Sequence, residues 1–373
     1  MTSQFFYGTL RDPELLAVVL GHSNAHLTPA TLPNYAVFHA GAEPFPQILP
    51  KLGAEAKGLL ARNLSKTDIE RLAFYEEGYD YLLRSIDVVC DGKNQTTKVW
   101  FPPSDGYPEG QEWSLLRWQE SYGRVAREAA SEAMTYLGLR TPQDVANGWR
   151  MIDSRAQARL IAAAAPDFGA SGQSRADDIE PLSFRRPYAR FFALEEHNLR
   201  FRNFDGRWSE PIERAVFIGA DAALVLPYDP KRDVVLLVEQ FRSGPFARGD
   251  RFPWCLEPIA GMVDGGEAPE DTARREALEE ANLTVHALLS IGSGYASPGD
   301  ATGFYHMFCA LTDLPETLAG VSGVQSESEN IKSHILSADH FFEKLDAGAF
   351  NVIPLQLMGH WLARHRETLR ARA

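Results

Sequence analysis

The chain has 373 residues, the length of two or three ordinary domains, and 45% of them are hydrophobic, which is enough to bury a core in each domain. Its 50 acidic residues exceed its 37 lysines and arginines, for a formal net charge of −13. This balance argues against nucleic acid and anionic membranes as partners, and the sequence has no apolar run of the roughly 18 residues that a membrane helix needs.

The cysteines and the N-terminus bear on the cellular compartment. Cys90, Cys255 and Cys309 are far apart in the sequence and lack the spacing of a metal site. The first ten residues contain no basic segment of the kind that begins a secretory signal. We therefore expect reduced thiols and a cytoplasmic protein.

The first 165 residues predict a mixture of strands and helices. An aromatic strand at residues 4–7 precedes a turn and an apolar helix at 13–20. Ser65 and Asp68 have the spacing of a capping box and predict the start of a second helix, which runs to about Tyr75. Further strands are expected at residues 35–39, 58–61, 81–90 and 96–101, a long helix at 112–137, and one or two helices within 141–164.

Two short motifs in this part of the chain, YGTL at residues 7–10 and LAFYE at 72–76, are similar to motifs of the γ-glutamylcyclotransferase (AIG2-like) family. The resemblance implies a β-barrel with helices, and a turn whose backbone N–H groups hold a γ-glutamyl substrate. The residues that it assigns to this turn are Tyr7, Gly8, Thr9 and Leu10. It also makes Glu76 the proton shuttle, which requires a carboxyl group with a raised pKa in a water-poor pocket. One position departs from the family pattern, since Ala73 stands where Asp is usual.

Residues 166–180 are rich in Gly, Ser and Asp and show no hydrophobic period. We therefore expect a linker here, between one domain at 1–165 and another at 181–373. In the second domain, strands are expected at residues 188–201, 213–219, 222–227, 234–241, 285–291 and 304–310, and helices at 338–347 and 353–370.

The segment Gly261–Leu283 contains a Gly-rich turn followed by a predicted helix with Pro269 as its first residue. At 3.6 residues per turn, Glu276, Glu279 and Glu280 share one helical face. Like charges at this spacing destabilise an isolated helix, so a compensating cation is expected. Because all the ligands are oxygens, Mg²⁺ or Mn²⁺ would suit the site.

This segment resembles the Nudix box, which is a Gly, five residues, a Glu, seven residues, and then Arg-Glu-x-x-Glu-Glu-x-Gly-apolar. The matching positions are Gly261, Glu267, Arg275, Glu276, Glu279, Glu280 and Leu283. Two positions depart from the pattern, since Ala277 is smaller than the usual aliphatic residue and Asn282 stands where Gly is usual. Asn adopts the left-handed conformation that a helix C-cap requires, so the second departure preserves the local structure.

The Nudix resemblance implies an α/β/α sandwich with a mixed sheet, and it assigns roles to the box. Glu276 and Glu280 would bind the metal, with Glu279 assisting. Glu267 would pair with Arg275 and attach the loop to the helix.

Similarity beyond the box, over roughly residues 188–362, is to the ADP-ribose pyrophosphatases of the Nudix family. The segments that carry it are VEQFR (238–242), LEPIAGMVDGGE (256–267), YASPG (295–299) and SESENIKSH (326–334). Pro298 lies 15 residues after the end of the box, a spacing typical of this subgroup. The resemblance implies that Arg214 and Arg242 contact the substrate, for which a planar guanidinium is suited, and that Phe191 stacks on adenine. Phe191 as a core residue stays open as the alternative.

The subgroup also implies a metal ligand and a base outside the helix. The backbone carbonyl oxygen of Ala260, just before the box, would bind metal. In the acidic loop 326–330, side chains of an extended backbone would alternate in direction, so Glu327 and Glu329 would point the same way. By position we assign Glu327 as the general base and Glu329 as a metal ligand or its support. The exchange of these roles stays open, as does a solvated acidic loop without a role in catalysis.

Together these features predict a cytoplasmic fusion of a cyclotransferase-like domain with a metal-dependent ADP-ribose diphosphatase that produces AMP and ribose 5-phosphate. The resemblance further implies a homodimer with exchanged N-terminal strands, and a relation to Nudix proteins associated with tellurite resistance. Two alternatives stay open. The substrate could be another nucleoside diphosphate conjugate, such as a nucleotide sugar, and the N-terminal domain could be a sensor that binds an acidic amino-acid derivative.

Overall fold

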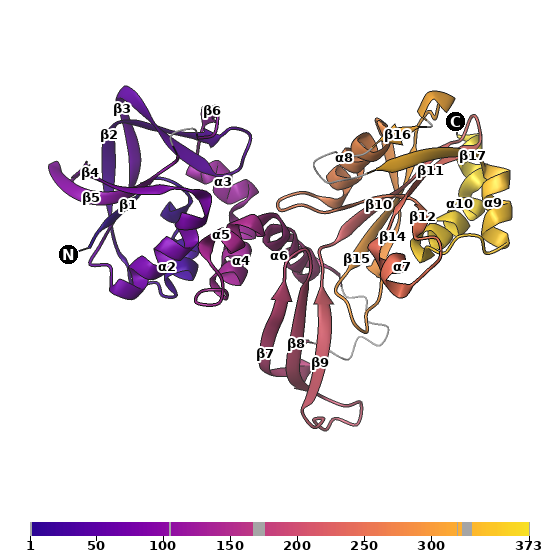
Figure 1. Ribbon diagram of the computed structural model, residues 1–373, viewed down its shortest axis with the longest axis horizontal. Coiled ribbons are helices and arrows are strands. Elements are labelled where there is room, and N and C mark those ends of the chain that lie inside the picture. Colours follow the sequence, from indigo (N-terminus) through magenta and orange to yellow (C-terminus); the bar gives the residue numbers. More distant parts are fainter. Residues whose placement is uncertain (1, 104–105, 167–175, 319, 323–329, 373) are drawn as a thin grey trace. The chain divides into compact units, whose positions relative to one another are not determined.

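Figure 1 shows the computed structural model of the chain, which describes all residues except 1, 104–105, 167–175, 319, 323–329 and 373. The chain divides into two compact units, Met1–Ala165 and Pro166–Ala373. Among the described residues, no helix is long and apolar enough to cross a membrane.

The first unit is built on a closed β-barrel. Its strands are β1 (Gln4–Phe6), β2 (His26–Ala40), β3 (Pro46–Arg62), β4 (Leu82–Cys90), β5 (Lys93–Phe101) and β6 (Glu109–Glu112). The order β3-β1-β5-β4-β2 closes into a ring because β2 also pairs with β3, and β6 pairs with one end of β2. The short strands expected at residues 35–39 and 58–61 are parts of the much longer β2 and β3. The expected barrel is confirmed.

Successive residues of β1 face opposite sides of the barrel wall. Phe5 lies in the barrel interior with Leu32, whereas Phe6 packs with Leu72 in a second core beneath the helices. Gly58 of β3 is required where it passes β1, because a Cβ there would lie 2.4 Å from both the Phe5 ring and the Phe6 carbonyl oxygen. The barrel wall therefore separates two tightly packed cores.

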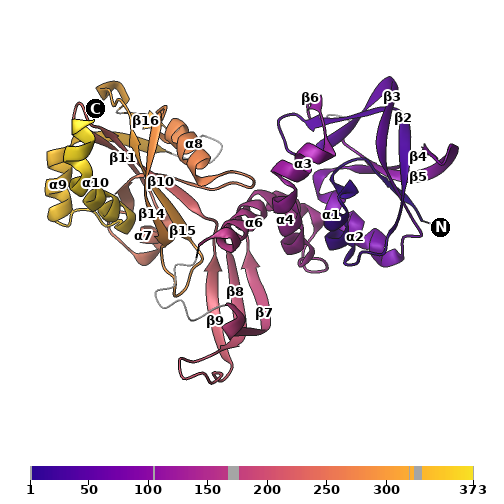
Figure 2. The ribbon, with the colours of Figure 1, turned by 180° about the vertical axis from the view of Figure 1, so that it is seen from behind.

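Helices gather at one side of this barrel (Figure 2). They are α1 (Pro13–Leu20), α2 (Lys66–Glu76), α3 (Leu115–Ser121), α4 (Gly123–Met134), α5 (Pro142–Asn147) and α6 (Trp149–Ala164). The capping box at the start of α2 is confirmed by reciprocal hydrogen bonds between Ser65 and Asp68. The single helix expected at residues 112–137 is wrong. Tyr122 leaves the helical conformation with a φ of −134°, and its hydroxyl donates to Asp153 of α6, so the chain bends between α3 and α4.

The second unit begins with an antiparallel sheet of three strands, β7 (Ile179–Ala189), β8 (Ala193–Phe201) and β9 (Ile212–Ile218). The single strand expected at residues 188–201 is wrong. The chain reverses at Arg190, whose N–H donates to the Phe192 carbonyl oxygen at 2.9 Å. The alternating aromatic pattern continues through this turn and therefore does not reveal it. The Phe217 N–H of β9 donates to the Asp300 carbonyl oxygen at 2.8 Å, which joins β9 to the connection between β14 (Ala287–Tyr295) and β15 (Phe304–Leu311).

A mixed sheet forms the centre of the second unit. Its strands are β10 (Ala222–Asp229), β11 (Val234–Phe241), β12 (Trp254–Glu257), β13 (Ile259–Met262), β14 (Ala287–Tyr295), β15 (Phe304–Leu311), β16 (Val321–Ser322) and β17 (Ile331–Ser337). The main order is β14-β15-β10-β11-β17-β16, with β12 paired to β11 and β13 paired to β10. β10 and β15 are parallel and the other pairs are antiparallel.

Helices cover both faces of this sheet, with α8 on one side and α9 and α10 on the other (Figure 1). The helices of this unit are α7 (Ser243–Arg248), α8 (Pro269–Ala281), α9 (Ala338–Asp346) and α10 (Ile353–Ala371). Successive side chains of β10 point to opposite faces of the sheet and therefore contribute to the core on each face. Val225 packs with Ala277 of α8, whereas Leu226 packs with Phe341 of α9. The expected sandwich with a mixed sheet is confirmed.

Candidate active site

Helix α8 has the ends that its sequence predicts. Pro269 is its first residue, and Glu270 and Asp271 occupy its first turn, where carboxylates interact favourably with the helix dipole. Asn282 ends the helix in the left-handed conformation, with a φ of 50°. Between these ends, Ala273, Ala277 and Ala281 pack against the sheet, and Glu276 and Glu280 are buried with them.

Arg275 lies at the centre of a hydrogen-bond network. Its guanidinium donates to Glu267, Glu276, Glu279 and the Met262 carbonyl oxygen, at distances between 2.6 and 3.2 Å. Burial alone would lower the pKa of Arg275, but hydrogen bonds to Glu267 and the charge of Glu276 raise it above the ordinary value. The network joins the Gly-rich loop to the helix, and it contains the pair between Glu267 and Arg275 that the sequence predicts.

Glu276 and Glu280 lie between α8 and the sheet, where they are 8% and 1% exposed. The Ala260 N–H donates to Oε2 of Glu280 at 3.3 Å. Gly261 lies directly beneath Glu276, because a Cβ there would come within 1.9 Å of the Glu276 carboxyl carbon. Two carboxylates, one helical turn apart, are thus packed against the backbone of β13.

The chemistry of these groups fits a hard divalent cation. Two carboxylates and the Ala260 carbonyl are all oxygen ligands, which Mg²⁺ and Mn²⁺ prefer. Removing carboxylates from water is costly unless positive charge balances them, and Arg275 supplies part of that balance to Glu276. Among the described residues, no three His, Cys, Asp or Glu side chains converge as a metal site. The remaining ligands would therefore be water, substrate phosphate or side chains outside that part of the chain.

Arg242 lies near this cluster and is held by a residue that the sequence did not single out. Its Nε donates to Oε1 of Glu257 at 2.7 Å, and Glu257 is buried at the end of β12. Burial lowers the pKa of Arg242, but the pair with Glu257 and then the charge of Glu280 produce a net rise. Burial raises the pKa of Glu257, even though Arg242 opposes the change. One feature of the sequence could have identified Glu257: it is the last residue of β12, and the other residues of that strand are uncharged.

Phe191 and Arg214 belong to the three-stranded sheet. Phe191 lies in the turn between β7 and β8 and is 66% exposed, so it is not a core residue. Arg214 lies on β9, is exposed, and donates to the Glu213 carbonyl oxygen at 2.9 Å. Within the described residues, no hydrogen bond or ring contact joins either side chain to α8.

Glu327 and Glu329 lie outside the described residues. The strands that flank their segment are described: Ser322 of β16 pairs with Ile331 of β17, and β16 contacts α8. The described ends of β16 and β17 are therefore paired, and β16 lies beside the helix of the box.

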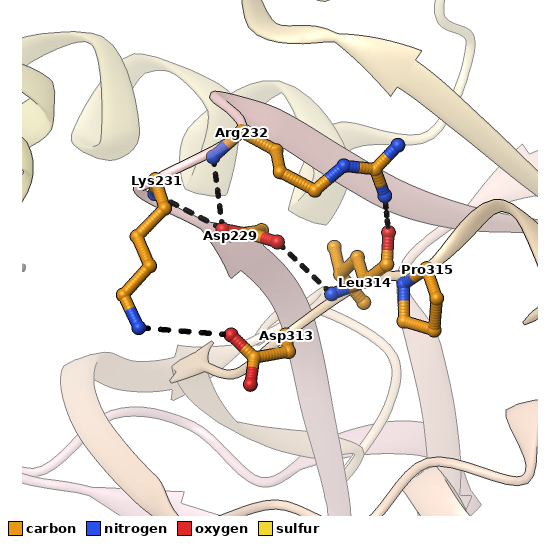
Figure 3. A pocket seen from close by; sticks show the side chains of 6 residues that line it. All are labelled: Asp229, Lys231, Arg232, Asp313, Leu314 and Pro315. Atoms are coloured by element: carbon orange, nitrogen blue, oxygen red, sulfur yellow. Dashed lines mark hydrogen bonds and ion pairs between the residues drawn. The ribbon is translucent and has the colours of Figure 1, made fainter.

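Figure 3 shows a pocket of about 520 Å³ that is lined by Asp229 and its neighbours. It lies at the end of β10, whereas β13 of the box pairs with the beginning of that strand. Asp229 accepts the backbone N–H groups of Lys231, Arg232 and Leu314 at 3.0–3.1 Å. The Arg232 guanidinium also donates to the Leu314 carbonyl oxygen. Asp229 thus stabilises the turn after β10, and the pocket is not part of the carboxylate cluster.

The first unit contains a second candidate site around Glu76, the last residue of α2. Burial raises the pKa of Glu76 to about 7. The tyrosines near it are Tyr7, Tyr75, Tyr79 and Tyr81. Burial is the largest cause of the raised pKa of each tyrosine, and the charge of Glu76 contributes to all four. The structure therefore brings the YGTL turn and Glu76 together.

The rest of the YGTL turn contributes mainly backbone to this site. Gly8 passes so close to Pro46 that a Cβ would lie 2.7 Å from the proline ring. Thr9 starts a short 3₁₀ helix, and the Leu10 side chain is buried in the core beneath the helices. Any contact of Leu10 with a ligand would therefore be made by its backbone.

Comparison with known proteins assigns a family to a range of residues in each of the two units. The model of the NUDIX domain matches residues 219–355, and the model "Gamma-glutamyl cyclotransferase, AIG2-like" matches residues 4–119. The chain is 36% identical to an ADP-ribose pyrophosphatase of Escherichia coli K12 over 198 residues, which are 52% of this chain and 92% of that protein. It is 38% identical to the ADP-ribose pyrophosphatase of Haemophilus influenzae over 186 residues, 48% of this chain and 85% of that protein.

A GDP-mannose pyrophosphatase of Yersinia enterocolitica is 32% identical over 137 residues, which are 37% of this chain and 71% of that protein. The sandwich, the box and these matches define the second unit as a Nudix hydrolase domain, and the chain belongs to the Nudix family. That domain resembles ADP-ribose pyrophosphatases, and it follows an N-terminal γ-glutamylcyclotransferase-like (AIG2-like) domain in the same chain.

Proposed function

We propose that the Nudix domain hydrolyses the diphosphate of ADP-ribose to AMP and ribose 5-phosphate with Mg²⁺ or Mn²⁺. The observation that carries the proposal is the pair of buried carboxylates, Glu276 and Glu280, packed against the backbone at Ala260 and Gly261. The identity to two proteins named ADP-ribose pyrophosphatase favours this substrate.

Each residue has a defined task in this proposal. Bound metal would neutralise the diphosphate and make a water molecule more acidic. Glu276, Glu280 and the Ala260 carbonyl oxygen would hold the metal, and Glu279 would assist them. Arg275 keeps the loop and helix together. Glu257 holds the guanidinium of Arg242, which would contact substrate phosphate.

The remaining assignments concern the base and the adenosine end. We assign Glu327 as the general base and Glu329 as a metal ligand or its support, with the exchange of these two roles as the alternative. Arg214 would contact the substrate, and Phe191 would stack on adenine, which its exposure permits. The fused architecture also leads us to place the protein with the cytoplasmic, tellurite-resistance-associated type of this subgroup.

Incubation with Mg²⁺ and a panel of nucleoside diphosphate conjugates tests the substrate assignment. We expect ADP-ribose to give the highest kcat/KM, with AMP and ribose 5-phosphate as products. Omission of Mg²⁺ and addition of EDTA should abolish turnover, and Mn²⁺ should restore it. Turnover of GDP-mannose without turnover of ADP-ribose would establish the nucleotide-sugar alternative, which the similarity to GDP-mannose pyrophosphatase keeps open.

We also propose that the protein is a homodimer that associates through the three-stranded sheet. This sheet carries several large apolar side chains that are each more than a third exposed: Phe184, Tyr188, Phe191, Phe192, Phe201 and Phe217. The rings of Tyr188, Phe192 and Phe217 form one cluster, with centroids 5.3 and 5.4 Å apart. An exposed apolar patch of this kind is typical of an interface.

Sedimentation equilibrium should therefore give twice the chain mass for the wild type. The double change Phe192→Ser and Phe217→Ser should shift the protein toward monomer, because it removes apolar area from the patch. Phe204→Ser is the matched control, since Phe204 is fully exposed in the loop between β8 and β9. A wild type that remains monomeric at micromolar concentration would contradict the proposal.

A second activity, γ-glutamylcyclotransfer, is favoured by one observation in the first unit. Glu76 has a pKa of about 7 among tyrosines, and a carboxyl group with such a pKa can both accept and donate a proton near neutrality. Release of 5-oxoproline from a panel of γ-glutamyl compounds tests this activity. Absence of release across the panel would favour the sensor alternative, in which the same site binds an acidic amino-acid derivative.

A further inference from the structure

Helices α5 and α6 lie outside the range 4–119 that matches the cyclotransferase family, yet they pack against the Glu76 site. The contact is close at Gly78, two residues after Glu76. A Cβ on Gly78 would lie 2.4 Å from the Pro142 carbonyl oxygen and 2.8 Å from Cβ of Ala146. The start of α5 therefore rests directly on the backbone that follows Glu76.

Trp149, the first residue of α6, continues this contact. Its ring packs edge-on against Tyr75 at 5.9 Å and against Tyr79 at 6.0 Å, measured between centroids. Tyr75 directly precedes Glu76, and Tyr79 follows it by three residues. Trp149 thus contacts one tyrosine before Glu76 in the sequence and one after it.

Buried charges hold α6 in this position. Arg155 of α6 and Glu132 of α4 are each 2% exposed, with 2.5 Å between Nη2 and Oε1. Asp153, also buried on α6, accepts a hydrogen bond from the Tyr122 hydroxyl. Breaking such a buried pair by removing one partner is strongly destabilising, so α6 has little freedom to leave the site.

We propose that residues 141–164 form one wall of the Glu76 site, and that Trp149 is the positioning residue that keeps water from its carboxyl group. The inference rests on the second proposed activity, because it states what makes Glu76 suitable for that reaction. Desolvation is the physical cause of the raised pKa of Glu76, so whatever covers the carboxyl group determines its proton affinity. The titratable groups that interact with the charge of Glu76 are Tyr7, Tyr75, Tyr79 and Tyr81. Asp153 interacts in turn with Tyr75 and Tyr79, and Tyr122 interacts with Tyr79.

Titration of the Glu76 carboxyl carbon by ¹³C NMR, in the full-length protein labelled at glutamate side-chain carboxyls, tests this proposal. The Glu76→Gln spectrum assigns the signal. We expect Trp149→Ala to lower the titration midpoint from about 7 toward the ordinary glutamate value of 4.5, by more than about one pH unit, because water then reaches the carboxyl group. Trp149→Phe should restore most of the wild-type midpoint, because a phenyl ring still covers the two tyrosines.

Leu160→Ala is the matched control, since it also shortens an apolar side chain of α6 but about three turns away from Trp149. Its midpoint should equal that of the wild type. An unchanged midpoint in a folded Trp149→Ala protein, or an equal fall in Leu160→Ala, would overturn the proposal. If Trp149→Ala does not fold, Trp149→Leu is titrated in its place, with the same expected direction. The readout does not require turnover, so an inactive N-terminal domain would disprove the cyclotransferase activity without deciding the role of Trp149.

Discussion

Glu280→Gln is expected to lower the rate of ADP-ribose hydrolysis by ~10²-fold or more, as when a bound metal loses a ligand or its support. Glu280 is 1% exposed and contacts the Ala260 N–H, so the glutamine fills the same space and can accept the same hydrogen bond. The loss should therefore come from the missing negative charge and not from misfolding. Steady-state kinetics across a range of Mg²⁺ concentrations would measure it.

Glu270→Gln is the matched control, because Glu270 is on the exposed surface of the same helix. It should retain nearly wild-type kcat/KM and the wild-type Mg²⁺ requirement. Near-normal turnover of Glu280→Gln at low Mg²⁺ would show that the metal assignment is wrong.

Glu76→Gln is expected to abolish release of 5-oxoproline from any γ-glutamyl compound that the wild type cleaves. Glutamine cannot move a proton, and general acid–base groups typically contribute about 10²–10⁴-fold to a rate. The neighbouring Glu77 is exposed, so Glu77→Gln makes the same chemical change outside the site. Retention of activity by Glu76→Gln, or an equal loss in Glu77→Gln, would contradict the assignment of Glu76 as the proton shuttle.

The same two variants give a second readout that does not need a substrate. The folded-state pKa of Glu76, about 7, is above its ordinary value of 4.5. The stability that Glu76 contributes is therefore fully present below pH 4.5 and is lost as the pH rises through 7. Gln cannot ionise, so Glu76→Gln should raise the unfolding temperature relative to wild type by more at pH 8 than at pH 5. Glu77→Gln should not show this difference.

Local features of the structure could be predicted from the sequence because neighbouring residues determine them. The ends of α8 follow from Pro269 and Asn282, and the start of α2 follows from the capping box at Ser65 and Asp68. The pairing of Glu267 with Arg275 also lies within one loop and helix. The barrel and the sandwich were predicted through the resemblance of short motifs to known families, whereas the shared face of the carboxylates follows from helical spacing.

Features that depend on distant residues were missed. The break at Tyr122 is accompanied by a hydrogen bond to Asp153, 31 residues later. Glu257 is a partner of Arg242 because β12 pairs with β11 in a register that the sequence does not display. The contact of Trp149 with the tyrosines near Glu76 depends on how α6 packs, so no local sequence pattern predicts it.

Gly261 places a limit on how this hydrolase can change over evolution. Even the single methyl group of alanine would overlap the Glu276 carboxyl group at this position, so any larger residue must displace that carboxyl group from its place against β13. We therefore expect replacements to be tolerated more readily elsewhere, in the arginine network or around Glu257. Chains of this architecture that carry another residue at position 261 are therefore expected to hold the Glu276 carboxyl group in a different position.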